Sequence, residues 1–233
     1  VFVLPGALAE RADEIAAGLH ASVTLGSGQF CTNPGLIIAL AGDDLDRFLA
    51  RLSECFAAGS PCTMLHGGIL EAYELGIEVL SAKPSVELLA HSAPEPDVGK
   101  TQAATALFVT DAEPFMNDAE MAEEVFGPST LVVRCETAEQ MLELACGLAG
   151  QLTATFHAGD ADRSLLDSLR PVMEAKAGRL LFGGFPTGVE VCAAMHHGGL
   201  YPAASDPRST SVGTAAILRF ARPICYQDWP QDQ

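Results

Sequence analysis

The sequence is short of positive charge. It carries 13 lysine and arginine residues against 30 aspartate and glutamate residues, which gives a formal net charge of −17. A nucleic-acid-binding surface is not expected, because the field of this acidic chain repels a phosphate backbone. Long apolar runs are also missing. The longest, residues 36–41, is only as long as a strand, so no membrane-spanning segment is predicted.

Cysteine pairs with metal-binding spacing are absent as well. No Cys-x-x-Cys pair occurs. The seven cysteines, an odd number, are at positions 31, 55, 62, 135, 146, 192 and 225. We therefore predict neither a zinc cluster nor a disulfide framework, and a reducing, cytoplasmic environment fits. Cys55, Cys135 and Cys146 have apolar neighbours and are expected to be buried. Adjacent His196 and His197 cannot share one helix face, so no metal site is predicted.

Apolar residues make up 48% of the 233 positions and charged residues only 18%, which excludes a disordered chain. No initiating methionine and no signal-peptide pattern precede the apolar start Val1-Phe2-Val3-Leu4-Pro5, which leads directly into a helical pattern. We therefore expect the chain to be a piece of a longer protein.

Apolar periodicity predicts an α/β fold. Helical spacing covers residues 7–24, a segment capped by Asp43 or Asp44, and residues 67–82, 118–124, 137–148 and 162–177. Pro171 is predicted to kink the last of these or to form the first turn of a new helix. Short apolar strands are predicted at 35–40, 106–109, 130–134, 152–156 and 179–182. This alternation indicates a mostly parallel, open sheet of five to seven strands with helices on both faces. We assign residues 1–204 to this domain, and 205–233 to a C-terminal interface tail.

Cys31 is the first candidate for chemistry. It lies in Gly26-Ser27-Gly28-Gln29-Phe30-Cys31-Thr32-Asn33-Pro34, a glycine-rich turn between a helix and a buried strand. Turns at the ends of elements present reactive groups, glycines allow close approach of a ligand, and a backbone N–H can stabilise an oxyanion. From the residues alone, an inert cysteine in a turn is the alternative.

Two motifs in this order resemble those of the aldehyde dehydrogenase superfamily. Residues 28–34 resemble its Gly-Gln-x-Cys-Thr-x-Pro nucleophile motif, and Glu123-Glu124-Val125-Phe126-Gly127-Pro128 resembles its Glu-Glu-x-Phe-Gly-Pro motif. Residues 182–189, Phe-Gly-Gly-Phe-Pro-Thr-Gly-Val, resemble its late substrate-side loop. With residues 210–216, they are most similar to the branch acting on 2,5-dioxopentanoate (α-ketoglutarate semialdehyde). The resemblance covers essentially the whole chain.

The resemblance implies a role for each matched residue. Cys31 takes the position of the nucleophile that forms a thiohemiacetal and then a thioester with a small, acidic aldehyde. Glu124 takes the position that hydrogen-bonds the nicotinamide ribose of NAD or NADP, and Phe126 the position beside the ring. The substrate-binding positions implied in this way are Phe30, Thr32, Pro186, Thr187 and Val189. A homo-oligomer is implied as well, with the C-terminal tail at the interface.

Three features of the superfamily do not occur in this sequence. Its general-base glutamate, its oxyanion-hole asparagine and its dinucleotide-binding domain are expected before the cysteine motif, where only Glu10 and Glu14 occur, in unrelated context. The resemblance therefore implies the catalytic portion alone, which we expect to be inactive without the N-terminal cofactor-binding domain. Gly183 departs from the asparagine that this branch tends to carry, which affects the shape of the substrate loop.

Two other classes of function stay open. Cys31 with His196 or His197 is also the residue pair of a cysteine hydrolase, which needs no nicotinamide. A non-catalytic interaction domain is the third class, in which Cys31 has no chemical role. On that interpretation Glu123 and Glu124 are a solvated helix end, and Phe126 is a core anchor at a turn.

Overall fold

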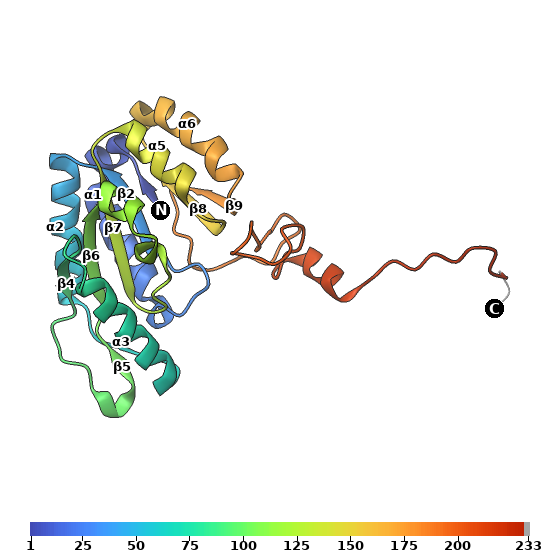
Figure 1. Ribbon diagram of the computed structural model, residues 1–233, viewed down its shortest axis with the longest axis horizontal. Helices are drawn as coiled ribbons and strands as arrows, with labels where there is room; N and C mark the ends of the chain where they lie inside the picture. The colour runs from blue at the N-terminus through green and yellow to red at the C-terminus, as the bar shows by residue number, and fades with distance from the viewer. Residues whose placement is uncertain (231–233) are drawn as a thin grey trace.

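A computed structural model describes residues 1–230, as a seven-stranded sheet with helices on both faces (Figure 1). The strand order is β4-β6-β7-β2-β1-β8-β9. The strands are β1 (Phe2–Val3), β2 (Leu36–Leu40), β4 (Glu87–His91), β6 (Ala106–Asp111), β7 (Ser129–Cys135), β8 (Gln151–His157) and β9 (Ala177–Phe182), and β3 (Cys62–Thr63) pairs separately with β5 (Gln102–Ala103). The helices are α1 (Pro5–Thr24), α2 (Asp43–Ala58), α3 (Gly67–Ser81), α4 (Ala112–Asn117), α5 (Ala138–Gly147) and α6 (Arg163–Glu174).

Every neighbouring pair in the large sheet is parallel except β4 and β6. The two-residue strand β1 lies inside the sheet, next to the central strand β2, where Phe2 is opposite Ile38 of β2 on one side and Phe156 of β8 on the other. The predicted fold class, a mostly parallel α/β sheet of up to seven strands, is confirmed.

Alternating strand residues supply two separate apolar layers. On β2, Ile37 and Ala39 face the layer formed with α1 and α2, whereas Ile38 faces the layer formed with α4, α5 and α6. The same alternation places Val132 in the first layer and Val133 in the second. Because successive side chains of a strand point to opposite faces, β2 is apolar throughout and β7 is apolar from Leu131 to Val133, which explains the continuous runs in the sequence.

The start of α1 is fixed by a carboxylate from the crossover that follows β8. Asp162 accepts the backbone N–H groups of Gly6 (2.8 Å), Ala7 (3.2 Å) and Gly159 (2.8 Å). An anion at this position satisfies N–H groups that have no partner within the helix and complements the helix dipole. Asp162 thereby joins the crossover that follows β1 to the crossover that follows the neighbouring strand β8.

Several local predictions were wrong. The N-cap of α2 is Gly42, without a side-chain bond, so neither Asp43 nor Asp44 caps it; both lie in its first turn. The acidic segment forms only a 3₁₀ turn, η3 (Ala119–Ala122), and Glu123 is extended. Helix α6 continues through Pro171, so no new helix begins there.

The prediction that Cys55, Cys135 and Cys146 are buried was correct for Cys135 alone, since Cys55 is half-buried and Cys146 is exposed. Burial raises the pKa of the Cys135 thiol to about 12. The exposed Cys146 is near the end of α5, on the side of the helix away from its buried residues Met141, Leu144 and Ala145. A cysteine among apolar neighbours in sequence therefore need not share their face of a helix.

After β9 the chain leaves the regular sheet. Residues 183–213 form a loop cluster beside it, followed by a 3₁₀ helix, η5 (Thr214–Phe220), and an extended segment that runs away from the sheet in Figure 1. Residues 231–233, which belong to the predicted interface tail, lie outside the described part of the chain.

Candidate active site

Cys31 lies at the edge of the sheet where the parallel strands begin. Helix α1 ends at Thr24, a 3₁₀ turn, η1 (Leu25–Gly28), reverses the chain, and β2 starts at Leu36. The side chain is exposed, in a turn held by a hydrogen bond from the Asn33 N–H to the Phe30 carbonyl (3.0 Å). Ligands of open α/β sheets usually bind at the opposite edge, beyond the carboxyl ends of the strands. Cys31 departs from this rule, and its position is set by the turn that carries it.

The two motifs predicted to form the site are in direct contact. Gly28 has a φ of +67°, and a Cβ atom placed there would lie 2.2 Å from the carbonyl carbon and oxygen of Gly127. The Asn33 side-chain amide also donates to the Gly127 carbonyl (2.8 Å). Only glycine fits at position 28, for conformational and for steric reasons. Segments 94 residues apart in sequence are thus joined at one point.

The second motif is anchored from its other side by Tyr73 of α3. The Tyr73 ring lies so close to Gly127 that a Cβ atom there would approach it to 2.2 Å. The Tyr73 hydroxyl donates to the Ala104 carbonyl (2.7 Å). Burial raises the pKa of Tyr73, which keeps it protonated and able to donate. Gly127 is therefore enclosed between Gly28 and an immobilised aromatic ring.

The turn that carries Cys31 has a second attachment, to the segment containing β3. The Ser27 hydroxyl donates to the Thr63 carbonyl (2.7 Å), and the Gln29 side-chain oxygen accepts the N–H of Leu65 (3.0 Å). Bonds on both sides of the turn define the position of the thiol. The motif residues Ser27, Gln29 and Asn33 act here through side-chain bonds to the backbone.

The predicted cofactor residues flank this junction. Glu124 and Phe126 are exposed, whereas Gly127 and Pro128 between them and β7 are buried. Phe126 is thus not the core anchor of the alternative interpretation. Of the predicted substrate residues next to the thiol, Thr32 is buried and Phe30 is half-buried against Gly26.

The loop after β9 returns along α1 toward the Cys31 edge. The Phe185 ring packs against Gly18, and the Thr187 hydroxyl lies 2.6 Å from the Ser22 hydroxyl, one turn further along the helix. Arg179 of β9 holds the loop from the other side by donating to the carbonyls of Pro186 (2.7 Å) and Gly188 (3.1 Å). Pro186 and Thr187 are thus tied to the scaffold, and Val189, two residues further on, is exposed.

The loop cluster brings His197 to the thiol. Cys31 Sγ and His197 Nε2 are 3.0 Å apart, and the imidazole is buried, with 6% of the residue exposed. The neighbouring His196 instead lies against Gly178 and Gly198. Sequence reasoning named both histidines as alternatives, and geometry selects His197. The 166 residues between the partners leave no local signal for this contact.

Positive charge gathers near the thiol. Burial lowers the pKa of His197, and the charges of Arg179 and His196 lower it further, which keeps the imidazole neutral. Burial also lowers the pKa of Arg179, and the nearby Cys31 opposes that shift. A fixed guanidinium in this otherwise acidic protein favours negative charge beside Cys31.

A second buried histidine supports the substrate loop. His157, at the end of β8, is 1% exposed and packs against Phe185, with ring centroids 5.2 Å apart. Neither ring nitrogen has a hydrogen-bond partner among the described residues. Burial lowers the pKa of His157 to about 4, and the charge of Arg11 contributes to the shift. The folded protein therefore holds this imidazole neutral.

Acidification is expected to destabilise the fold through His157. Between the ordinary pKa of 6.5 and the folded value of about 4, the unfolded chain binds a proton that the folded chain excludes. The contribution to stability is complete above pH 6.5 and is lost as the pH falls. At pH 5 it amounts to about 2 kcal/mol of unfolding free energy.

Urea unfolding at pH 8 and pH 5 measures this effect. Between pH 8 and pH 5, the free energy of unfolding of His157→Leu should fall by about 2 kcal/mol less than that of the parent chain, because leucine does not titrate. His91→Gln, which alters an exposed histidine, is the matched control and should behave as the parent chain does. Equal pH dependence in all three proteins contradicts the assignment.

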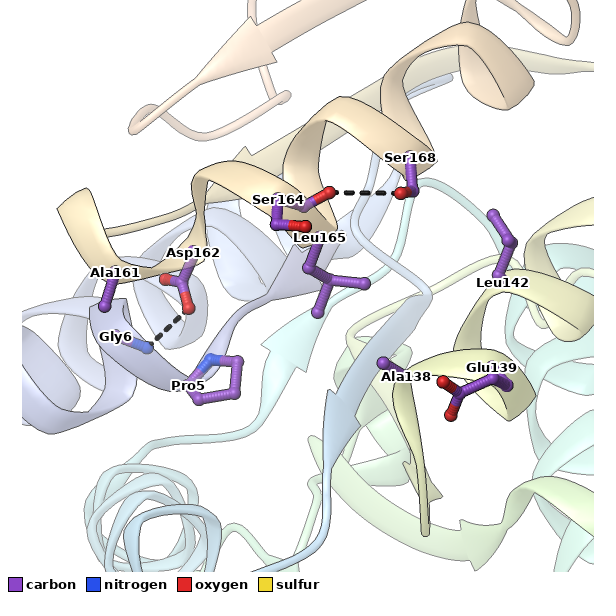
Figure 2. A pocket seen from close by; sticks show the side chains of 10 residues that line it. All are labelled: Pro5, Gly6, Ala138, Glu139, Leu142, Ala161, Asp162, Ser164, Leu165 and Ser168. Carbon is purple, nitrogen blue, oxygen red and sulfur yellow. Dashed lines mark hydrogen bonds between the residues drawn. The ribbon is translucent and has the colours of Figure 1, made fainter.

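A hollow at the opposite edge of the sheet does not form part of this site. Figure 2 shows it between the starts of α1, α5 and α6, lined by Pro5, Gly6, Ala138, Glu139, Leu142, Ala161, Asp162, Ser164, Leu165 and Ser168. Its buried carboxylate, Asp162, is already occupied by backbone N–H groups, and the Ser168 hydroxyl donates to the Ser164 carbonyl (3.0 Å). The buried carboxylate of the hollow therefore serves to hold the start of α1 in place.

Within residues 1–230 no three histidine, cysteine, aspartate or glutamate side chains are grouped so that they could hold a metal ion. None of the helices described there has the length and apolar character needed to cross a bilayer.

Comparison with known proteins identifies relatives that cover the whole chain. The chain is 48% identical over its full length to alpha-ketoglutaric semialdehyde dehydrogenase 2 of Azospirillum brasilense, and 42% identical over 99% of its length to alpha-ketoglutaric semialdehyde dehydrogenase of Acinetobacter baylyi. It spans 44% of the length of each of these curated relatives. No family model matches the chain. The predicted resemblance to the aldehyde dehydrogenase superfamily is confirmed by these relatives.

Solved structures show the same fold. Gamma-glutamyl-gamma-aminobutyraldehyde dehydrogenase from Burkholderia cenocepacia superimposes with a TM-score of 0.73, at 16% identity, over 93% of this chain and 42% of that chain. The 1-pyrroline-5-carboxylate dehydrogenase from Thermus, solved with bound NAD, superimposes with a TM-score of 0.71, at 20% identity, over 85% of this chain and 37% of that chain.

Proposed function

Because the chain is homologous to aldehyde dehydrogenases over its full length, we propose that it is the nucleophile-bearing part of an NAD(P)-dependent aldehyde dehydrogenase. The substrate class is a small, acidic aldehyde resembling 2,5-dioxopentanoate, which is oxidised to a carboxylate. The observation that carries this proposal is the junction of the two motifs, where Gly28 and Asn33 contact Gly127 beside the exposed thiol of Cys31.

Cys31 acts as the nucleophile in this proposal. Its sulfur bonds to the aldehyde carbon, and loss of a hydride to the nicotinamide then leaves a thioester that water hydrolyses. Glu124 and Phe126 bind the cofactor, because both are exposed next to the motif junction. Phe30, Thr32, Pro186, Thr187 and Val189 shape the substrate pocket. The positive charge of Arg179 near Cys31 favours a substrate that carries a carboxylate.

The proposal places the cofactor-binding domain outside this chain. Residues 1–204 form the catalytic domain, and the 44% coverage of the relatives leaves room for a second domain. Exposed apolar side chains occur at the end of β9 and in the loop cluster after it: Phe182 is 67% exposed and Val191 71% exposed. Such side chains are commonly covered by another domain or subunit. A cytoplasmic, reducing location suits an enzyme that depends on a free thiol.

Residues 205–233 pack on a second copy of the chain in this proposal, which makes the full-length enzyme a homo-oligomer. Tyr226 and Trp229 are exposed and contact each other edge-to-face, with ring centroids 5.5 Å apart. Paired aromatics of this kind are typical of interface centres. Light scattering before and after removal of residues 212–233 tests the assignment, which fails if a folded protein keeps the same mass.

The contact between Cys31 and His197 also fits a second function, a cysteine hydrolase. The two functions differ in cofactor dependence. We expect the full-length enzyme, meaning a protein that contains this chain and spans the relatives' whole length, to form NAD(P)H with 2,5-dioxopentanoate. Pentanal, which has the same chain length without the carboxylate and the 2-oxo group, should react with a kcat/KM about tenfold or more lower, because the charge interaction and the polar contacts of the keto group are both lost.

The control for this assay is omission of the nicotinamide. Without it the full-length enzyme should not convert the aldehyde. Thiol-dependent hydrolysis of a peptide or amide substrate at a catalytic rate in the absence of nicotinamide, combined with no NAD(P)H formation in its presence, contradicts the dehydrogenase and favours the hydrolase.

A further inference from the structure

We propose that His197 is a positioning residue for Cys31, and that it acts as a neutral hydrogen-bond donor to the sulfur rather than as a base. The proposal rests on Cys31 being the nucleophile. Its first support is geometric, since Cys31 Sγ and His197 Nε2 lie 3.0 Å apart although they belong to distant segments. The imidazole is buried and the thiol exposed, so the ring fixes one side of the sulfur and leaves the other side open.

The backbone of His197 is itself held by the serine- and threonine-rich run that precedes η5. The His197 N–H donates to the Thr210 hydroxyl (2.8 Å), which donates onward to the Val212 carbonyl (2.6 Å). The His197 carbonyl accepts both the N–H (2.9 Å) and the hydroxyl (3.1 Å) of Ser211. Thr210 is buried. These hydrogen bonds show that residues 210–212 help to position the imidazole. The proposed function leaves these residues without a chemical role.

The protonation state of His197 follows from its surroundings. Burial and the charges of Arg179 and His196 keep the ring neutral, and its Nδ1 has no hydrogen-bond partner among the described residues. An imidazolium would bury an unpaired N–H at Nδ1, which is costlier than an unpaired acceptor. The neutral ring with its proton on Nε2 avoids this cost and directs its N–H at the sulfur.

A donor at this position assists the first chemical step. The thiol proton leaves to water, and the thiolate formed accepts the His197 N–H while Arg179 supplies nearby positive charge. A remaining sulfur electron pair then bonds to the aldehyde carbon, and the carbonyl π pair moves onto the aldehyde oxygen. His197 neither gains nor loses a proton in this step. A hydrolase base would have to take the thiol proton, so the two roles are distinguishable.

Alkylation of Cys31 tests this role without cofactor or aldehyde. Iodoacetamide is applied to this 233-residue chain at pH 7, and each cysteine is followed by peptide mass spectrometry. His197→Ala should slow alkylation of Cys31 about tenfold, because the thiolate loses one hydrogen bond, and such a bond to a charged group accounts for a change of this size. His197→Gln keeps an N–H donor and should restore most of the rate. Cys146 and Cys225, both exposed, serve as internal references whose rates stay constant.

Three further variants separate positioning from general damage. His196→Gln alters the adjacent histidine, which does not contact the thiol, and should leave the Cys31 rate unchanged. Thr210→Val removes the hydroxyl that holds His197 and should slow alkylation, whereas Thr210→Ser should not. The two Thr210 variants also keep the test available if His197→Ala fails to fold, which circular dichroism reveals.

The pH profile gives the decisive readout. The difference between the parent chain and His197→Ala should be largest near neutral pH and should vanish at alkaline pH, where both thiols are ionised. An unchanged or faster rate in His197→Ala overturns the proposal, and so does a His197→Gln chain as slow as His197→Ala. Because no aldehyde oxidation is measured, failure here leaves the dehydrogenase proposal standing, and a lack of dehydrogenase activity does not alter this result.

Discussion

Cys31→Ala is expected to lower NAD(P)H formation by the full-length enzyme at least about 10⁴-fold, because removal of a covalent nucleophile abolishes the route through the thioester. The fold should be unaffected, since the side chain is exposed and its one described contact is with His197. The measurement is the initial rate of NAD(P)H formation with 2,5-dioxopentanoate, together with the thermal midpoint of each protein.

Cys146→Ala is the matched control. Cys146 is also exposed, and it lies near the end of α5, so its replacement should leave kcat within about twofold of the parent enzyme, as for most surface changes. A Cys31→Ala enzyme that is folded and retains the parent rate contradicts the assignment of the nucleophile. Equal loss in both variants points to general damage by cysteine replacement.

The 233-residue chain by itself is expected to form no detectable NAD(P)H. The general base and the asparagine donor of the superfamily have no counterpart before Cys31 in this sequence. Loss of a base lowers a rate by about 10²–10⁴, and loss of one oxyanion donor by about 10²–10³. Loss of the cofactor-binding domain removes the hydride acceptor altogether.

The isolated chain should nevertheless be folded, because two complete apolar layers cover the sheet. Circular dichroism checks this point alongside the activity assay. Addition of NAD(P) and aldehyde to the folded chain, at concentrations that saturate the full-length enzyme, should give no turnover above that of the Cys31→Ala chain. Appreciable turnover means that a base and a cofactor site lie within residues 1–233, which contradicts the domain assignment.

Much of this fold was predictable because its strands are buried on both faces. The runs around Ile37 and Val132 are apolar at every position, so strand type and parallel pairing could be inferred together. Strand β1 was not predicted as a strand because two residues give no periodicity. Strand β4 was missed as well: it lies at the edge, is half exposed, and contains a register shift between Leu88 and Ala90.

The site was predictable where it depends on motifs and not where it depends on tertiary contacts. The turn around Cys31 and the segment ending at Gly127 were singled out by their residue strings, yet the reason for Gly28 and Asn33 emerges only from their contact with Gly127. The choice of His197 over His196 depends on a loop without regular structure, whose path is fixed by Thr210 and Ser211. No periodicity encodes such a contact.

Acid quenching of the full-length enzyme during turnover tests the central claim most directly. The intact protein and its peptides are analysed by mass spectrometry with 2,5-dioxopentanoate and NAD(P) present, and with Cys31→Ala as the reference. We predict that the peptide containing Cys31 gains the mass of the substrate acyl group minus one hydrogen, and that the reference gains nothing. Turnover by the parent enzyme with an adduct on another cysteine, or the same adduct on the reference protein, contradicts the assignment of Cys31 as the nucleophile.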